Sequence, residues 1–266
     1  MIKVFRNYLS YCLESLRIGF KCLNEYRVNL YMAFMSHLFF TLTLLGFLFI
    51  SIDKFAQFSL SFEEVLFFTF YGQAFAMFGY FFRYGSRLDR VLLSGQFNVF
   101  LVKPLNVFLQ YIFYKNPFYV FFLFVFDFFM VFVVGVYFDL FLDFFGFILC
   151  LIFSFFGIIF FILIHRLFDS LAFFFKDFNL FKKPYNYCEK IYHQFPVLIF
   201  DGFLKHFGFL VGFSFYGVVP VFWYFGVIGF DELVFYFKLL CLLIFISSGL
   251  ICLLWNFGLK RYEAFG

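Results

Sequence analysis

The sequence predicts an all-α protein that crosses a membrane six times. This prediction rests on the amino-acid composition and on the positions of the charged residues. Hydrophobic residues make up 65% of the chain and charged residues 14%, whereas about a quarter of a soluble domain is charged. The mean hydropathy is +0.97. Charged residues separate apolar stretches of about 20 residues, the length of one transmembrane helix. The 266 residues leave no room for a separate soluble domain of about 100 residues, so we expect any water-soluble catalytic partner to be another chain.

Residues 1–28 are expected to form an amphipathic helix on the membrane surface. They lack the apolar core and the cleavage site of a signal peptide. Apolar side chains recur every three or four residues and share one helical face: Ile2, Phe5, Leu9, Cys12, Leu16, Phe20 and Leu23. The remaining surface is mainly basic, as in helices that bind an anionic leaflet. A calmodulin-like target or an ordinary soluble amphipathic helix has the same pattern, but here an apolar stretch follows directly after Arg27.

Residues 29–266 are predicted to form one transmembrane domain. Charged residues bound the apolar stretches of spans one to four and of the last span, at residues 30–52, 65–82, 117–138, 144–175 and 233–257. Hydropathy alone places the fifth span at residues 195–217. A long polar loop, residues 83–116, follows span two.

The positive charges predict the orientation of the six spans. All Lys and Arg residues except Lys54, Lys205 and Lys238 lie in four segments that six spans place on one side, namely residues 1–28, 83–116, 165–195 and 258–266. By the positive-inside rule this side is cytoplasmic. We therefore expect both termini to lie in the cytoplasm.

Several function classes lack support in the sequence. The six Cys residues show no Cys-x-x-Cys pair and no metal-ligand spacing with His, so we expect no disulfide, metal or redox site. The net charge of +4 is not gathered in a solvated basic domain, so nucleic-acid binding is not expected. No Gly-x-x-x-x-Gly-Lys-Ser/Thr loop is present to hold ATP phosphates. No nucleophile, base or metal set converges, and we expect a chain that is not an enzyme.

Two segments resemble one protein family. The chain ends on Arg261-Tyr262-Glu263-Ala264-Phe265-Gly266 directly after the last span, and the loop after span two contains Ser94-Gly95-Gln96 and then Lys103-Pro104-Leu105. These segments resemble a bacterial branch of the type-2 ATP-binding-cassette (ABC) transporter permeases, whose chains close on Arg-Tyr-Glu-Ala-x-Gly. That branch has Ser-Gly-Glu and Leu-x-Arg-Pro-Leu in the loop, so Gln96 and Lys103 depart from its pattern.

The resemblance implies a permease subunit of an ATP-driven exporter in the bacterial inner membrane. Its partners would be separate ATPase subunits, which bind ATP and Mg, and a second permease chain, identical or related. This chain itself would bind no cofactor. The loop after span two would dock on the ATPase, with these candidate contact residues: Arg87, Asp89, Arg90, Ser94, Gly95, Lys103 and Pro104. Without the resemblance, the same charges would be read as an ordinary solvated loop.

The resemblance also implies a different arrangement before the last span. Span five would occupy residues 180–199, and residues 201–225 would form short re-entrant helices from the outer face. Span five would then be polar and would have to face protein or water, because a charged side chain in hydrocarbon costs about 2.5–3.5 kcal/mol.

Four polar side chains inside the predicted spans are candidates for the translocation path: Asp127, His165, Arg166 and Asp169. Asp127 lies midway along span three, where a carboxylate must be neutral or paired. It faces the path or the second subunit, or it is bonded to a neighbouring helix. Arg166 and Asp169 can pair at i, i+3, so a structural pair is the alternative to substrate contact. A different hypothesis is a proton-coupled carrier that uses Asp127, Asp169 and Asp201.

Overall fold

The computed structural model describes residues 2–50, 60–83, 88–114, 116–141, 143–175, 179–194, 197, 202–210 and 212–262. All regular elements in these ranges are helices: α1 (Ile2–Glu25), α2 (Arg27–Ile50), α4 (Phe62–Arg83), α5 (Leu88–Leu93), α6 (Asn98–Val102), α7 (Val107–Ile112), α8 (Phe118–Tyr137), α9 (Phe144–Ser170), η1 (Leu171–Phe173), α10 (Asn179–Gln194), α11 (Gly202–Leu210), η3 (Ser214–Val218), α12 (Val219–Tyr224) and α13 (Phe230–Arg261). The all-α fold class is confirmed.

Five helices are long and apolar enough to cross a membrane, namely α2, α4, α8, α9 and α13. They correspond to the predicted spans one to four and to the last span. The molecule is therefore a multi-pass membrane protein, with a sixth crossing if the bent pair of α11 and the segment Ser214–Tyr224 is counted as one span.

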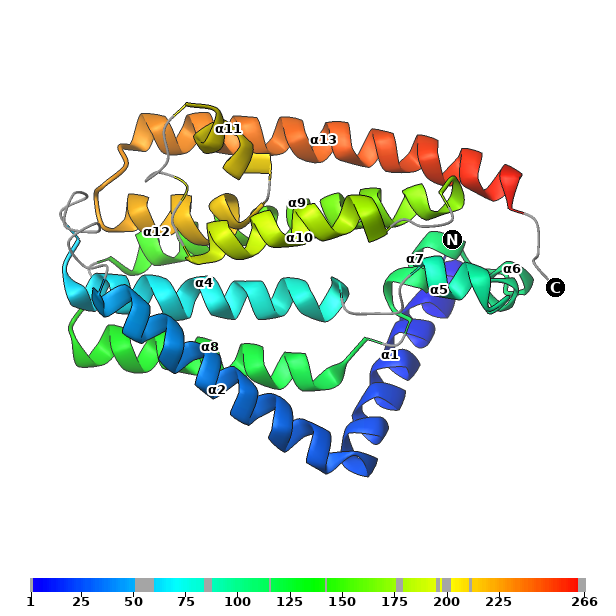
Figure 1. Cartoon of the computed structure of the whole chain (residues 1–266), viewed down its shortest axis with the longest axis horizontal. Coiled ribbons are helices and arrows are strands. Elements are labelled where there is room, and N and C mark those ends of the chain that lie inside the picture. Colours follow the sequence, from blue (N-terminus) through cyan, green and yellow to red (C-terminus); the bar gives the residue numbers. More distant parts are fainter. Residues whose placement is uncertain are drawn as a thin grey trace.

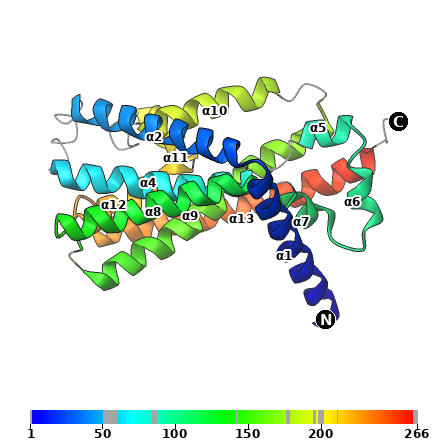
Figure 2. The same ribbon diagram turned by 90° about the horizontal axis from the view of Figure 1, so that it is seen from below.

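The long helices run lengthwise, and the short helices gather at the two ends (Figure 1). α5, α6 and α7 lie at one end, with the start of α1 and the end of α13, whereas α11 and α12 lie at the other. α1 crosses the first end at a steep angle to the spans (Figure 2). The start of α1 and the end of α13 thus lie at the same end of the bundle.

The segment before α13 differs from the hydropathy prediction. α11 and the segment Ser214–Tyr224 are bent by 87° relative to each other, so a straight fifth span over residues 195–217 is wrong. Hydropathy averages over a window and cannot register a sharp turn inside an apolar stretch. The polar helix α10 instead runs lengthwise beside the spans (Figures 1 and 2). Its residues, Asn179–Gln194, fall almost entirely within the range 180–199 that the resemblance implied for span five.

The core of the bundle lies around α4, which packs against α8 and α9. α9 also packs against α13, and η3 fits between α4 and α9. Gly157 on α9 allows η3 to approach closely, because a Cβ at this position would lie 2.7 Å from the backbone nitrogen of Tyr216. A glycine in α9 therefore brings the bent segment into the middle of the bundle.

Candidate functional site

The loop after α4 folds into a compact unit rather than an open polar loop. α5, α6 and α7 pack together with α13 around an apolar core of their own: Leu88, Val91, Leu92, Phe97, Phe100, Tyr111 and Trp255. This core is separate from the main core of the bundle. The loop thus has an apolar core of its own, which includes Trp255 of α13.

A tight turn at Ser94 and Gly95 joins α5 to α6. Gly95 has a φ of 71°, a left-handed conformation that glycine adopts without steric cost. Its amide donates to the Leu92 carbonyl at 3.2 Å, and the Ser94 hydroxyl donates to the Val91 carbonyl at 3.3 Å. The turn buries Phe97 completely in the loop core. Ser94 and Gly95 thus shape the loop.

The outer face of α5 and α6 combines apolar and basic side chains. Val102 on α6 is 86% exposed and Leu93 on α5 is 61% exposed, and Arg90 is exposed one turn before Leu93 on α5. Exposed apolar groups beside charges are typical of protein interaction sites. Asp89 is partly buried on α5, and the predicted contact residue Arg87 lies outside the described residues.

Lys103 and Pro104 follow α6, and Lys103 contacts α1. The ammonium nitrogen of Lys103 lies 5.3 Å from the centre of the Tyr11 ring. Pro104 is exposed. The Gln110 amide on α7 donates to the carbonyls of Phe100 at 3.0 Å and Leu105 at 2.9 Å. These bonds hold the segment with Lys103 and Pro104 against α7.

The C-terminal motif contacts the loop directly after the Ser94-Gly95-Gln96 motif. The Tyr262 ring centre lies 4.9 Å from that of Phe97, and the Tyr262 hydroxyl donates to Asn98 Oδ1 at 3.2 Å. Glu263 and Ala264 of the same motif lie outside the described residues. The end of the last span is thereby attached to the loop.

Asp169 is the centre of a buried ionic cluster near the loop. It is 5% exposed and accepts hydrogen bonds from Arg166 Nη1 at 3.1 Å, Lys182 Nζ at 2.5 Å and the Tyr111 hydroxyl at 3.0 Å. Arg166 also donates to the Phe82 carbonyl. Burial, and secondarily the charge of Asp169, raise the pKa of Tyr111 in the loop, which keeps its hydroxyl protonated as a donor. The cluster joins α4, α7, α9 and α10.

Glu189 on α10 is the centre of a second cluster. It is 2% exposed and accepts hydrogen bonds from Arg83 Nη1 and from the Tyr80 hydroxyl, each at 2.7 Å. Arg83 Nη2 donates to Asn186 Oδ1 at 2.7 Å. His165 Nε2 lies 3.5 Å from Glu189 Oε2. α10 is thus bound to α4 and α9 through charged groups.

Asp127 is bonded to a neighbouring helix, which was one of the two predicted alternatives. It is completely buried, and both carboxylate oxygens lie 2.9 Å from His37 Nε2 on α2. Thr41, one turn further along α2, donates to Gln73 Oε1 on α4 at 2.9 Å. These polar contacts connect α2 to α8 and α4 inside an apolar bundle.

α10 has a second, outward-facing side that is basic and aromatic. Lys183, Tyr187 and Lys190 are spaced at i, i+4 and i+7, and all three are exposed. The Lys190 ammonium nitrogen lies 5.9 Å from the centre of the Tyr187 ring. The opposite side carries the buried Tyr185 and Glu189. A lipid-facing position would leave two ammonium groups in hydrocarbon, so this face needs water or protein.

A family model described as ABC-2 family transporter protein matches residues 27–266. The chain belongs to the ABC-2 transporter family. Membership in this family, together with the five long apolar helices, identifies it as a membrane permease subunit of an ABC transporter. The family match begins at the first residue of α2 and leaves out α1. No curated protein and no solved structure matches the chain.

The sequence predicts the Arg166–Asp169 pair of this ABC-2 permease but singles out neither member of the Arg83–Glu189 pair. For the contacts of His37, Tyr111 and Lys182, it singles out only the aspartate. The missed partners are His37, Arg83, Tyr111, Lys182 and Glu189. A lone histidine inside span one was a usable signal for His37. Within the part of the chain that the structure describes, no group of three or more His, Cys, Asp or Glu residues is placed to hold a metal ion.

Proposed function

We propose that this ABC-2 permease forms the translocation path of an ATP-driven exporter and that separate ATPase subunits dock on the outer face of α5 and α6. The observation that carries the proposal is exposure, because Leu93 and Arg90 on α5 and Val102 on α6 are all exposed at one end of the bundle. Arg87, Asp89 and the turn at Ser94 and Gly95 belong to the same contact in this proposal. ATP and Mg bind to the ATPase partners, and this chain binds neither.

The Asp169 cluster transmits the motion of the loop to the spans. Tyr111 belongs to the loop core, and its hydroxyl bonds directly to Asp169 on α9. Asp169 is also bonded to Lys182 on α10. A displacement of the loop by an ATPase therefore reaches α9 and α10 through charged hydrogen bonds, which are stronger than neutral ones. In this proposal His165, Arg166 and Asp169 are transmission residues, and Asp127 stabilises the bundle.

The outward face of α10 lines the path. Lys183, Tyr187 and Lys190 cannot face hydrocarbon at low cost, and a water-filled path between two permease chains, identical or related, gives them a polar environment. The loop, α1 and both termini lie on the cytoplasmic side of a bacterial inner membrane, in keeping with the positive charges of these segments.

Affinity purification from mild detergent, with the adjacent ATPase gene co-expressed, tests the docking proposal. We expect wild type to capture the ATPase and the double change Arg90→Glu with Val102→Asp to lose it, because both changes oppose docking on this face. Lys21→Glu on α1 is the control, since it reverses one exposed charge away from α5 and α6. Capture of no ATPase by any form, with transport that survives ATP depletion and stops with an uncoupler, would instead favour a proton-coupled carrier.

A further inference from the structure

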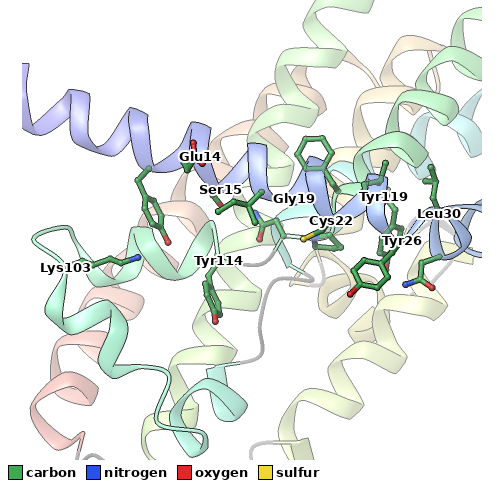
Figure 3. Close-up of a pocket in the computed structure, with 16 residues that line it drawn as sticks. Glu14, Ser15, Gly19, Cys22, Tyr26, Leu30, Lys103, Tyr114 and Tyr119 are labelled. Atoms are coloured by element: carbon green, nitrogen blue, oxygen red, sulfur yellow. The ribbon is translucent and has the colours of Figure 1, made fainter.

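A pocket of about 690 Å³ lies between α1 and the segment that leads from the loop into α8 (Figure 3). Its volume is in the range of about 300–1,000 Å³ typical of small-molecule sites. One wall comes from α1 and the start of α2, and the other from Lys103, Tyr114 and residues 116–119. Ile18 and Tyr26, both in its wall, are more than half exposed, so the pocket can be reached from outside.

The pocket lies at the level where two spans begin. Asn29 and Leu30 near the start of α2 line it, as do Pro117 and Phe118 at the start of α8. The first residues of transmembrane helices mark the boundary between hydrocarbon and headgroups. Tyrosines are enriched at this boundary, and four of them line the pocket: Tyr11, Tyr26, Tyr114 and Tyr119.

The charges of the pocket favour an anion. Glu14 and Lys103 both line it, and Glu14 lies 3.6 Å from Arg17. Lys103 stacks on the Tyr11 ring and has no carboxylate within ion-pair distance among the described residues. The acid of the pocket thus has a cationic neighbour, whereas its base has no anionic neighbour among the described residues.

A buried amide in the pocket wall also lacks a partner. Asn116 lines the pocket, and both its amide nitrogen and its amide oxygen are shielded from solvent without a hydrogen bond to any described residue. Buried amides are normally hydrogen-bonded, and leaving one unpaired costs about 1–3 kcal/mol. A polar ligand group next to Asn116 would remove this cost.

We propose that this pocket binds one anionic phospholipid of the adjoining leaflet. Its phosphate would lie at Lys103, its ester groups at Asn116, and an acyl chain along Ile18, Leu23 and Leu30 of α1 and α2. The apolar wall favours a lipid over a small soluble anion. The lipid connects α1 to the loop, and this role is independent of whether an ATPase docks on α5 and α6.

Photo-crosslinking of the full chain in phosphatidylcholine vesicles tests this proposal. The probe is phosphatidylglycerol with a diazirine on an acyl chain, compared with the same probe built on phosphatidylcholine. We expect phosphatidylglycerol to crosslink to residues 11–30 and 116–119 more strongly than phosphatidylcholine. Lys103→Gln should weaken this crosslink about fivefold, from the effect of one lysine on an anionic lipid.

Two further variants complete the design. Lys21→Gln removes an exposed lysine of α1 that does not line the pocket and should leave the crosslink unchanged. Asn116→Leu keeps the side-chain size and should weaken the crosslink if Asn116 contacts the lipid. Both probes reacting equally, an unchanged yield in Lys103→Gln, or crosslinks confined to residues 31–50 of α2 and to α13 would each overturn the proposal. Unfolding midpoints of all variants show whether each loss is specific to the pocket.

Discussion

At the scale of single residues, each buried carboxylate in the described part of this permease has a partner on another helix. Asp127 is held by His37, Asp169 by three donors, and Glu189 by Arg83 and Tyr80. A charge in hydrocarbon is costly, and a buried pair remains sensitive to the loss of one member. The candidate residues for the translocation path, Asp127 and Asp169, therefore also form hydrogen bonds that hold helices together.

The His37–Asp127 pair gives a direct stability test. We expect His37→Leu to lower the free energy of unfolding by about 3–5 kcal/mol, because it leaves a buried carboxylate unpaired. Replacing both residues by Leu should recover much of this loss. Unfolding midpoints in detergent measure both effects, with the exposed His206→Leu as the control. Equal losses in the single and double variants would contradict the pairing.

Gly157 tests the close packing of η3 on α9. Gly157→Ala should cost about 1–3 kcal/mol, since the added methyl overlaps the backbone of Tyr216. Gly249→Ala on α13 is the matched control, because nothing lies within 4 Å of its added Cβ. That change should be neutral or stabilise the helix by up to about 1 kcal/mol. Thermal unfolding of the two variants distinguishes packing from helix propensity.

At the scale of elements, α10 differs from every other lengthwise helix. One side carries the buried Glu189, and the other carries Lys183, Tyr187 and Lys190. The long apolar helices expose mainly apolar side chains, as on α13, where Phe245 is 78% exposed. This two-sided pattern is what a helix between a protein core and a water-filled path requires.

Cysteine labelling tests whether the outward-facing side of α10 is in contact with water. In a variant without the six native cysteines, we expect Tyr187→Cys to react with a membrane-impermeant thiol reagent at least about tenfold faster than Phe245→Cys. The reaction requires a thiolate in water, and a lipid-facing thiol stays protonated. Equal rates at the two positions would contradict a water-filled path along α10.

At the scale of the whole molecule, the polar contacts form a route from the loop to the bundle. Tyr262 attaches the end of α13 to the loop, and Tyr111 attaches the loop to Asp169. Lys182 continues the route to α10. The loop is thus connected to three lengthwise helices, whereas Leu93 and Val102 on its outer face are largely exposed.

Removing the Asp169 carboxylate from this series of contacts should uncouple ATP binding from movement of the spans. In the complex with its ATPase, we expect ATP and vanadate to change the labelling rate at Tyr187→Cys. Asp169→Asn should abolish this change while ATPase capture persists, because the loop face remains intact. Glu232→Gln, an exposed acid at the start of α13, is the control and should behave like wild type. A response that persists in Asp169→Asn would overturn the transmission route.

The sequence by itself determined the fold class, the places of five spans and the family. These follow from the partition of side chains between hydrocarbon and water and from two short motifs, and neither depends on distant contacts. Hydropathy misplaced the fifth span, because a bend of 87° leaves no trace in an averaged window. Only the tertiary structure paired His37 with Asp127 and brought Tyr262 onto Phe97. Such partners lie far apart in the chain, and helix packing, which local sequence does not encode, decides which of them meet.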